Sequence, residues 1–213
     1  MAQRNYRLGD RLIMALDGLL RAGAPRAPDA IASPGAAVVD SVLGAKAKAA
    51  SARLMRVNHT GEICAQALYL AQASLARAET TRQVLEHAAR EEHAHLQWCA
   101  ERLTELEARP SRLNGIWFGG AYALGLVSAA AGDGVSLGFL EETEKQVVTH
   151  LDEHLGKLPV ADRKSRAILL QMKRDEARHA ARASSMGAQA LPAPARGLMR
   201  LQALVMKTVA SRI

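Results

Sequence analysis

Two copies of the motif Glu-x-x-His, at Glu92–His95 and Glu176–His179, are the part of this sequence best suited to chemistry. Each copy falls on a run in which apolar residues recur every three or four positions, the pattern of a buried helix face. The spacing puts each carboxylate and imidazole one turn apart on that face. A buried carboxylate is costly without compensation, and no basic residue lies in register on a facing stripe. We therefore expect both motifs to bind metal.

Each motif has a glutamate upstream at a matched distance. Glu62 precedes Glu92 by 30 residues, and Glu144 precedes Glu176 by 32. One Glu from each of two helices, with Glu-x-x-His from each of two others, is the ligand set of di-metal carboxylate bundles. Oxygen ligands with one nitrogen per metal suit iron or manganese over zinc. The predicted ligands are Glu62, Glu92, His95, Glu144, Glu176 and His179.

The ligand upstream of the second motif has competitors, because Glu141, Glu142 and Glu144 lie close together. Glu142 points away from the face that the other two share. Glu141 would give a spacing of 35 residues, further from the 30 of the first half, so Glu144 is preferred and Glu141 is the alternative.

Two further residues are candidates to hydrogen-bond a ligand or contact a substrate. Tyr69 lies seven residues beyond Glu62 on the same face, although a core tyrosine fits this position equally well. His150 lies six residues beyond Glu144 and is a candidate outer partner of a ligand.

The elements that must position these residues are helices. Ala, Leu, Arg, Glu and Gln dominate, which predicts an all-α protein, and 213 residues suit one bundle domain, expected over 41–213. Residues 1–40 are expected to hold a short amphipathic helix at 8–22 and a Pro/Ala/Gly linker at 23–36. The predicted bundle helices cover about 41–77, 80–108, 135–155 and 159–185, the second capped by the threonine pair at 80–81.

Two segments lie outside these four helices. Residues 113–132 carry no charge and contain five glycines, which favours an interfacial or hairpin-like hydrophobic element, with a buried connection as the alternative. Residues 196–212 predict an amphipathic helix with Leu198, Leu201, Val205 and Val209 on one face. Such a helix is typical of a membrane surface or a partner interface, and plain packing is the alternative.

The net charge of +7 is concentrated near the C-terminus, since no Asp or Glu follows Glu176. Basic residues there suit RNA or anionic lipid headgroups. The aromatic residues gather in the uncharged segment and are not interleaved with Lys and Arg, so we expect no nucleic-acid partner. Two cysteines without a C-x-x-C motif, and the lack of a secretory signal, indicate a reducing, bacterial-type cytoplasm.

The stretch Arg56-Val-Asn-His-Thr-Gly-Glu62, both Glu-x-x-His motifs and the uncharged segment together resemble the demethoxyubiquinone hydroxylase family. These are di-iron monooxygenases of ubiquinone biosynthesis, and the resemblance spans about 51–213. It implies two iron ions per subunit, one held by Glu62 and His95, the other by Glu144 and His179, with Glu92 and Glu176 bridging. Tyr69 and His150 fall where the family has the same residue types.

We therefore expect a ferritin-like four-helix bundle with a hydrophobic membrane-interacting segment, associated peripherally with the cytoplasmic face of the cell membrane. The expected reaction is O2-dependent hydroxylation of a polyprenyl quinol ring. Electrons would come from an external reductant or from the quinol itself, since no nucleotide-binding motif is present. Other proteins of ubiquinone biosynthesis are possible partners. The alternatives are another di-iron enzyme, such as a tRNA hydroxylase, and an iron-storage bundle.

Overall fold

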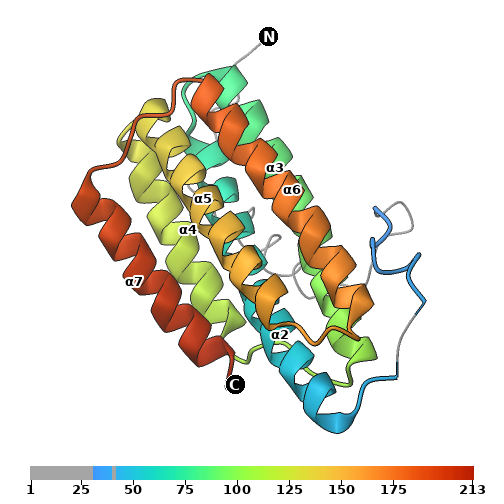
Figure 1. Ribbon diagram of the computed structural model, residues 1–213. Helices are drawn as coiled ribbons and strands as arrows, with labels where there is room; N and C mark the ends of the chain where they lie inside the picture. Colours follow the sequence, from blue (N-terminus) through green and yellow to red (C-terminus); the bar gives the residue numbers. More distant parts are fainter. Residues whose placement is uncertain (1–30, 40–41) are drawn as a thin grey trace.

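The computed structural model describes residues 31–39 and 42–213, which contain helices and no strand. The helices are α2 (Ala45–Leu75), α3 (Glu79–Glu105), α4 (Asn114–Ala130), α5 (Asp133–Lys157), α6 (Arg163–Ser185) and α7 (Ala193–Ala210) (Figure 1). The all-α prediction is confirmed for these residues. The predicted helix at 8–22 and most of the linker lie outside the described residues, and the division at residue 40 stays a prediction.

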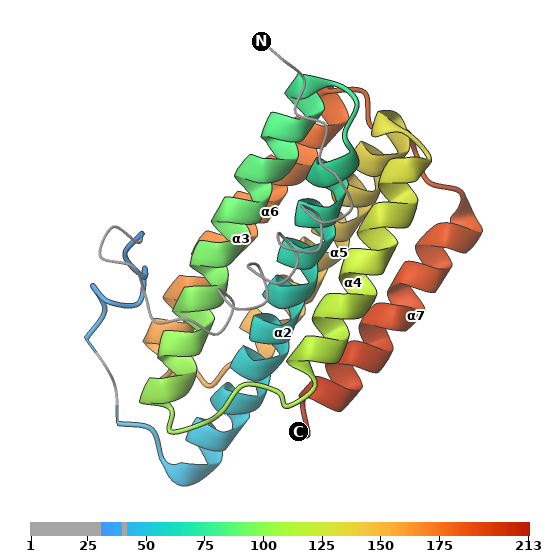
Figure 2. The ribbon, with the colours of Figure 1, turned by 180° about the vertical axis from the view of Figure 1, so that it is seen from behind.

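Four long helices form an antiparallel bundle. The pairs α2–α3 and α5–α6 pack along their lengths, and contacts of α3 with α6 and of α2 with α5 close the bundle. Helix α4 runs back along the outside of α2, so that α5 begins at the same end of the bundle as α3 (Figure 2). The long crossover therefore places α2 and α5 side by side and antiparallel.

The uncharged segment 113–132 forms one uninterrupted helix, so the hairpin-like prediction is wrong. One face of α4 is buried against α2, as the buried-connection alternative expected, while Ile116 and Val127 on the other side are 66% and 69% exposed. A Cβ at Gly125 would lie 2.5 Å from the carbonyl oxygen of Leu68, so glycine is required where the two helices meet. Among the described helices, none has the length and apolar character needed to cross a membrane.

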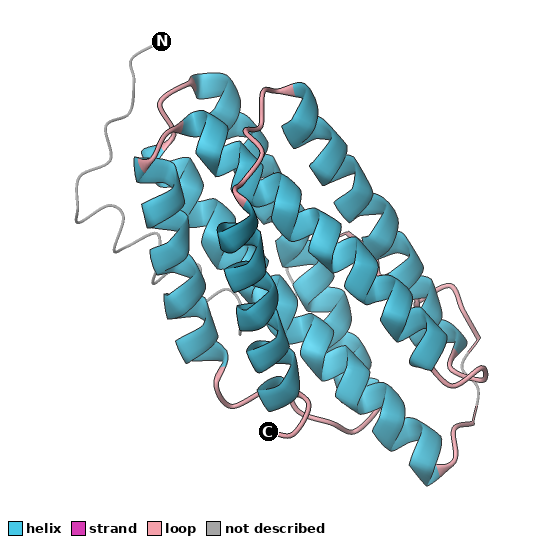
Figure 3. Cartoon of the chain, turned by 60° about the vertical axis from the view of Figure 1, so that its left-hand side comes forward, coloured by secondary structure: helices cyan, strands magenta, loops and turns pink. Residues whose placement is uncertain are grey.

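Helix α7 lies along the outside of the bundle, on the side that Figure 3 brings forward. It contacts α2 and α5. Of the predicted apolar face, Leu198, Leu201 and Val205 remain 64%, 57% and 49% exposed. The amphipathic helix is therefore present, and most of its apolar face is turned away from the bundle.

The start of α3 differs from the prediction. The helix begins at Glu79, so the threonine pair at 80–81 lies inside the first turn, and no side chain caps it. Instead, the Asp133 carboxylate accepts hydrogen bonds from the backbone N–H groups of Arg77 and Ala78, at 2.9 and 2.7 Å. A residue distant in the sequence thus holds the turn that leads into α3.

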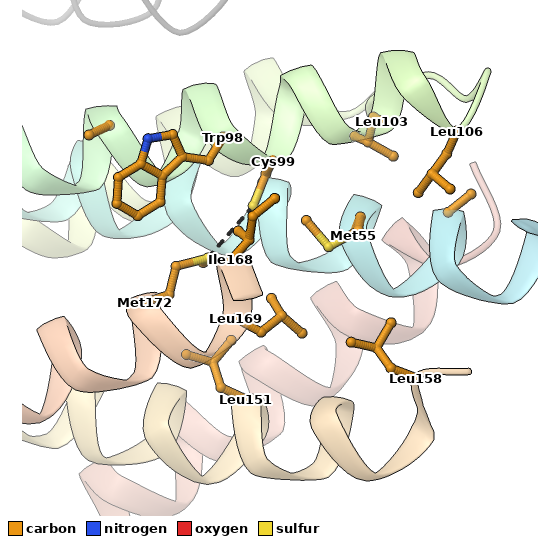
Figure 4. Packing of buried hydrophobic residues seen from close by; sticks show 12 residues of the cluster. Met55, Trp98, Cys99, Leu103, Leu106, Leu151, Leu158, Ile168, Leu169 and Met172 are labelled. Carbon is orange, nitrogen blue, oxygen red and sulfur yellow. Dashed lines mark hydrogen bonds between the residues drawn. The ribbon is translucent and has the colours of Figure 1, made fainter. Parts of the chain in front are cut away.

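Between the four long helices, two apolar clusters lie on either side of a polar layer, and a third cluster packs α4 against α2 and α3. One cluster packs Met55, Cys99, Leu103, Ile168 and Met172, and the sulfur atoms of Cys99 and Met172 are 3.9 Å apart (Figure 4). The other contains Tyr69, Leu85, Ala88, Leu140 and Ala183. The stretch of each bundle helix between the two clusters carries the predicted metal ligands.

Candidate metal centre

The six predicted ligands come together in the polar layer. Each is between 1% and 6% exposed: Glu62 on α2, Glu92 and His95 on α3, Glu144 on α5, and Glu176 and His179 on α6. Four carboxylates and two imidazoles are therefore removed from water at the centre of the bundle, where apolar side chains would otherwise pack.

One group gathers around His95. Its Nδ1 atom lies 3.6 Å from an oxygen of Glu62, 3.4 Å from Oε2 of Glu92 and 3.0 Å from Oε1 of Glu176. One ligand atom from each of these four residues lies within 4.8 Å of the others, a spacing suited to a single metal ion.

The other group gathers around His179. Its Nδ1 atom lies 3.4 Å from Oε1 of Glu92, 3.3 Å from Oε1 of Glu144 and 3.1 Å from Oε2 of Glu176. These four residues also bring their ligand atoms within 4.8 Å. Glu92 and Glu176 belong to both groups, and each directs one oxygen to each histidine, which is the arrangement expected of carboxylates that bridge two ions.

The atoms of this layer fit cations better than they fit one another. Oε1 of Glu92, Oε1 of Glu176 and Nδ1 of His95 are buried without a hydrogen-bond partner among the described residues. The 3.0 Å contact between the last two is close but lacks hydrogen-bond geometry. Buried, unpaired donor and acceptor atoms are costly, and two divalent ions would satisfy all of them.

The electrostatics of the layer agree with a shared positive charge. Burial, followed by the neighbouring carboxylates, raises the pKa of Glu144, and burial raises the pKa of Glu62. Burial also acts on Glu92, but its close contacts with both histidines outweigh burial and lower its pKa. The pKa of His179 is raised because three carboxylates overcome the opposing effect of burial. The carboxylates and imidazoles of this layer therefore act strongly on one another.

Each histidine also meets an outer carboxylate that the sequence analysis missed. Nε2 of His95 lies 3.1 Å from Asp175, and Nε2 of His179 lies 2.7 Å from Glu91. Each acid immediately precedes the motif on the opposite helix. The doubled acid at the start of both motifs was the available signal. Such partners fix the ring orientation of metal-bound histidine and leave Nδ1 free to bind.

The glutamate run on α5 separates in the structure. Glu144 is 1% exposed and lies in the ligand layer. Glu141 instead pairs with Lys145 at 2.5 Å, and Glu142 accepts a hydrogen bond of 2.7 Å from Gln146. This placement favours Glu144 over Glu141 as the ligand.

The two additional candidates have different surroundings. The Tyr69 hydroxyl donates a hydrogen bond to Glu144, in the ligand layer. His150 makes no hydrogen bond to a predicted ligand among the described residues, and its ring lies against that of His154 with a centroid distance of 3.8 Å. Its expected role as an outer partner of a ligand therefore has no support in the geometry.

A cavity of about 570 Å³ lies beside the ligand layer, between α2, α4, α5 and α7. Its wall includes the buried ligand Glu62, the apolar side chains of Leu68 and Leu124, and the exposed residues Arg200 and Leu204. The cavity therefore connects the ligand layer with the molecular surface. A cavity whose wall is mainly apolar, beside a metal site, suits a hydrophobic small molecule.

Comparison with known proteins agrees with this geometry. A family model described as ubiquinone biosynthesis protein COQ7 matches residues 49–210. Proteins named 3-demethoxyubiquinol 3-hydroxylase from Variovorax paradoxus and Delftia acidovorans are 51% and 50% identical to the chain, over 96% of its length and 98% and 100% of theirs. The protein of that name from Xanthomonas axonopodis is 50% identical over 96% of this chain and 94% of its own.

Proposed function

The chain belongs to the COQ7 family of ubiquinone biosynthesis proteins, and we propose that it hydroxylates the ring of a polyprenylated demethoxyubiquinol with two iron ions held by the six buried ligands. It is an enzyme of ubiquinone biosynthesis, and its substrate is a quinol. The family match favours this activity over a tRNA hydroxylase or an iron-storage bundle.

The observation that carries the di-iron proposal is the overlap of the two ligand groups through Glu92 and Glu176. Glu62 and His95 would hold one ion, Glu144 and His179 the other, and the shared glutamates would bridge them. Each ion receives one imidazole and several carboxylate oxygens, a donor set that suits iron. Iron bound here would supply the activation of O2 for transfer of one oxygen atom to the ring.

The residues of the chain hold this centre and keep it dry. Asp175 and Glu91 orient the two histidines, and Tyr69 holds Glu144 by its hydroxyl. The apolar clusters on both sides of the ligand layer exclude water from the bundle. The cavity beside Glu62 would admit the quinol ring next to the metals, while its apolar length receives the start of the isoprenoid tail.

The isoprenoid tail of the quinol is insoluble in water, so the enzyme should act at a membrane. Helices α4 and α7 lie on the same side of the bundle (Figures 1 and 2). Both carry exposed apolar side chains, and both contribute residues to the cavity wall. Arg200 and Lys207 on α7 would face anionic headgroups. Peripheral binding to the cytoplasmic face of the membrane would let the quinol pass from the bilayer into the cavity. Electrons would come from the quinol or an external reductant.

A direct test uses the purified, iron-loaded protein with a short-chain demethoxyubiquinol, a chemical reductant and ¹⁸O2. The expected product is the hydroxylated quinol carrying one ¹⁸O atom, detected by mass spectrometry. Glu176→Ala, which removes a proposed bridge, should reduce the yield by at least about a hundredfold. An unlabelled hydroxyl group, or full activity of the metal-free protein, would contradict the proposal.

A further inference from the structure

Two groups stand out among the buried polar atoms that have no hydrogen-bond partner in the described part of the chain. One is the ligand layer already described. The other is the cavity wall, where Asn58, Trp117 and His150 carry buried side-chain nitrogen or oxygen atoms with no hydrogen-bond partner. These three residues come from α2, α4 and α5 respectively. Since nearly all buried polar groups in proteins are paired, the second group indicates a ligand with polar atoms in this cavity.

Asn58 stands out among these three residues. Its side chain belongs to a residue that is only 2% exposed, and neither its amide nitrogen nor its amide oxygen finds a partner in the described residues. Asn58 precedes Glu62 by one helical turn, so both share one face of α2, and both line the cavity. The unpaired amide is therefore adjacent to a proposed iron ligand.

The neighbours of Asn58 are paired, which shows that this part of α2 can satisfy polar groups locally. Thr60 donates its hydroxyl to the backbone carbonyl of Arg56 at 3.1 Å. His59 lies 3.5 Å from the amide nitrogen of Asn114. Only the side chain that lines the cavity lacks such contacts in this stretch, and a leucine there would avoid the cost of burying an amide.

We propose that Asn58 binds an oxygen substituent of the quinol ring and so sets which ring carbon faces the metals. This inference rests on the proposed function. The ring hydroxyl donates to the amide oxygen of Asn58, which has no other partner among the described residues. A hydrogen bond one turn from Glu62 orients the ring, whereas the apolar wall, which contacts the tail, cannot distinguish one ring position from another.

The test compares two probes, a short-chain demethoxyubiquinol and its bis-methyl ether, which cannot donate a hydrogen bond. Their dissociation constants are measured anaerobically by equilibrium dialysis with the iron-loaded protein. Wild type should prefer the quinol. Asn58→Leu should weaken quinol binding about tenfold and change ether binding less than about twofold, because only the quinol loses a hydrogen bond.

Gln66→Leu is the matched control. Gln66 is a buried amide on the same helix, 4% exposed, and it does not line the cavity. The Gln66→Leu variant should keep the wild-type ratio of the two dissociation constants, for the quinol and for the ether. The melting temperature of Asn58→Leu should not fall, since the change removes two unpaired buried atoms, and Asn58→Ala provides a second variant should the leucine not be accommodated.

The possible results distinguish the role of Asn58 from the proposed function of the protein. An unchanged quinol-to-ether ratio in both Asn58 variants, or an equal change in Gln66→Leu, would overturn the role of Asn58. Absence of quinol binding by wild type would instead refute the proposed function. If only the Asn58 variants lose the preference for the quinol over its ether, Asn58 would be established as a substrate-binding residue.

Discussion

Tyr69 and Glu144, 75 positions apart in the sequence, are joined by a hydrogen bond of 2.7 Å in which the phenol donates to a carboxylate oxygen. The tyrosine is fully buried, and burial followed by the charge of Glu144 raises its pKa, so the phenol keeps its proton and remains a donor. The bond connects α2 with α5 across the ligand layer. It therefore fixes the carboxylate that the sequence assigned with least certainty.

Tyr69→Phe should weaken metal binding by about ten- to a hundredfold in the half of the site that contains Glu144 and His179. The phenylalanine fills the same space but leaves the carboxylate oxygen without its donor. A competition titration of Fe(II) against a chelator under anaerobic conditions measures the effect. Tyr122→Phe, at a buried tyrosine on α4 that stacks on Phe118, is the control and should bind iron as wild type does.

Glu144→Ala should bind much less iron than Glu141→Ala, because only Glu144 lies in the buried layer. Metal analysis after anaerobic reconstitution should give about two irons per chain for wild type and Glu141→Ala. Glu144→Ala should lose at least about half of that content. The opposite order would show that the assignment of the α5 ligand is wrong while leaving the di-iron site intact.

Much of the fold could be predicted because its signals are local and periodic. The stripes that carry Glu92 and Glu176 identify two bundle helices, and the matched spacing to Glu62 and Glu144 identifies the other two. The ends of helices were harder to predict. Arg77 and Ala78, the two residues just before α3, donate their backbone N–H groups to Asp133 on a distant helix, and no local pattern reveals that contact. The hairpin-like prediction for 113–132 failed because the five glycines were taken only to dilute its hydrophobicity, whereas Gly125 serves close packing of two helices.

The site divides in the same way. The six candidate ligands share a motif and a period, so the sequence could propose them. Asp175 and Glu91 each contact a histidine on the opposite helix. These contacts depend on the outward orientation of Nε2 of each histidine, and the spacing of residues in the sequence does not reveal that orientation. The distinction between His150, beside the cavity, and Tyr69, beside a ligand, likewise depends on three-dimensional packing.

Acid should destabilise the protein partly through His154. Burial, followed by the charges of Lys157 and Lys207, lowers the pKa of His154 to about 3. The unfolded chain takes up a proton on this histidine below about pH 6.5, whereas the folded chain does not until near pH 3. The free energy of unfolding should therefore fall with pH below about 6.5, by up to about 1.4 kcal/mol per pH unit from this group. Urea denaturation of wild type and His154→Gln from pH 7 to 5 should show a smaller fall in the variant, and equal slopes would exclude this contribution.

The exposed face of α7 should bind anionic membranes. Leu198→Ser combined with Leu201→Ser should reduce sedimentation with anionic vesicles at least about fivefold, because each leucine contributes apolar contact. Leu170→Ser, at a 39% exposed leucine on α6, is the control and should sediment like wild type. Equal sedimentation of all three proteins would indicate that this face does not contact lipid.

The central claim is that this chain hydroxylates demethoxyubiquinol at the buried carboxylate–histidine layer, and quinone analysis of a deletion strain tests it most directly. Lipid extracts of a strain that lacks the protein, and has no other hydroxylase to substitute for it, should accumulate demethoxyubiquinone and contain no ubiquinone. Wild type should restore ubiquinone, whereas Glu92→Ala and Glu176→Ala, expressed at equal levels, should not. Normal ubiquinone in the deletion strain would contradict the assigned reaction, and full rescue by Glu176→Ala would contradict the proposed metal centre.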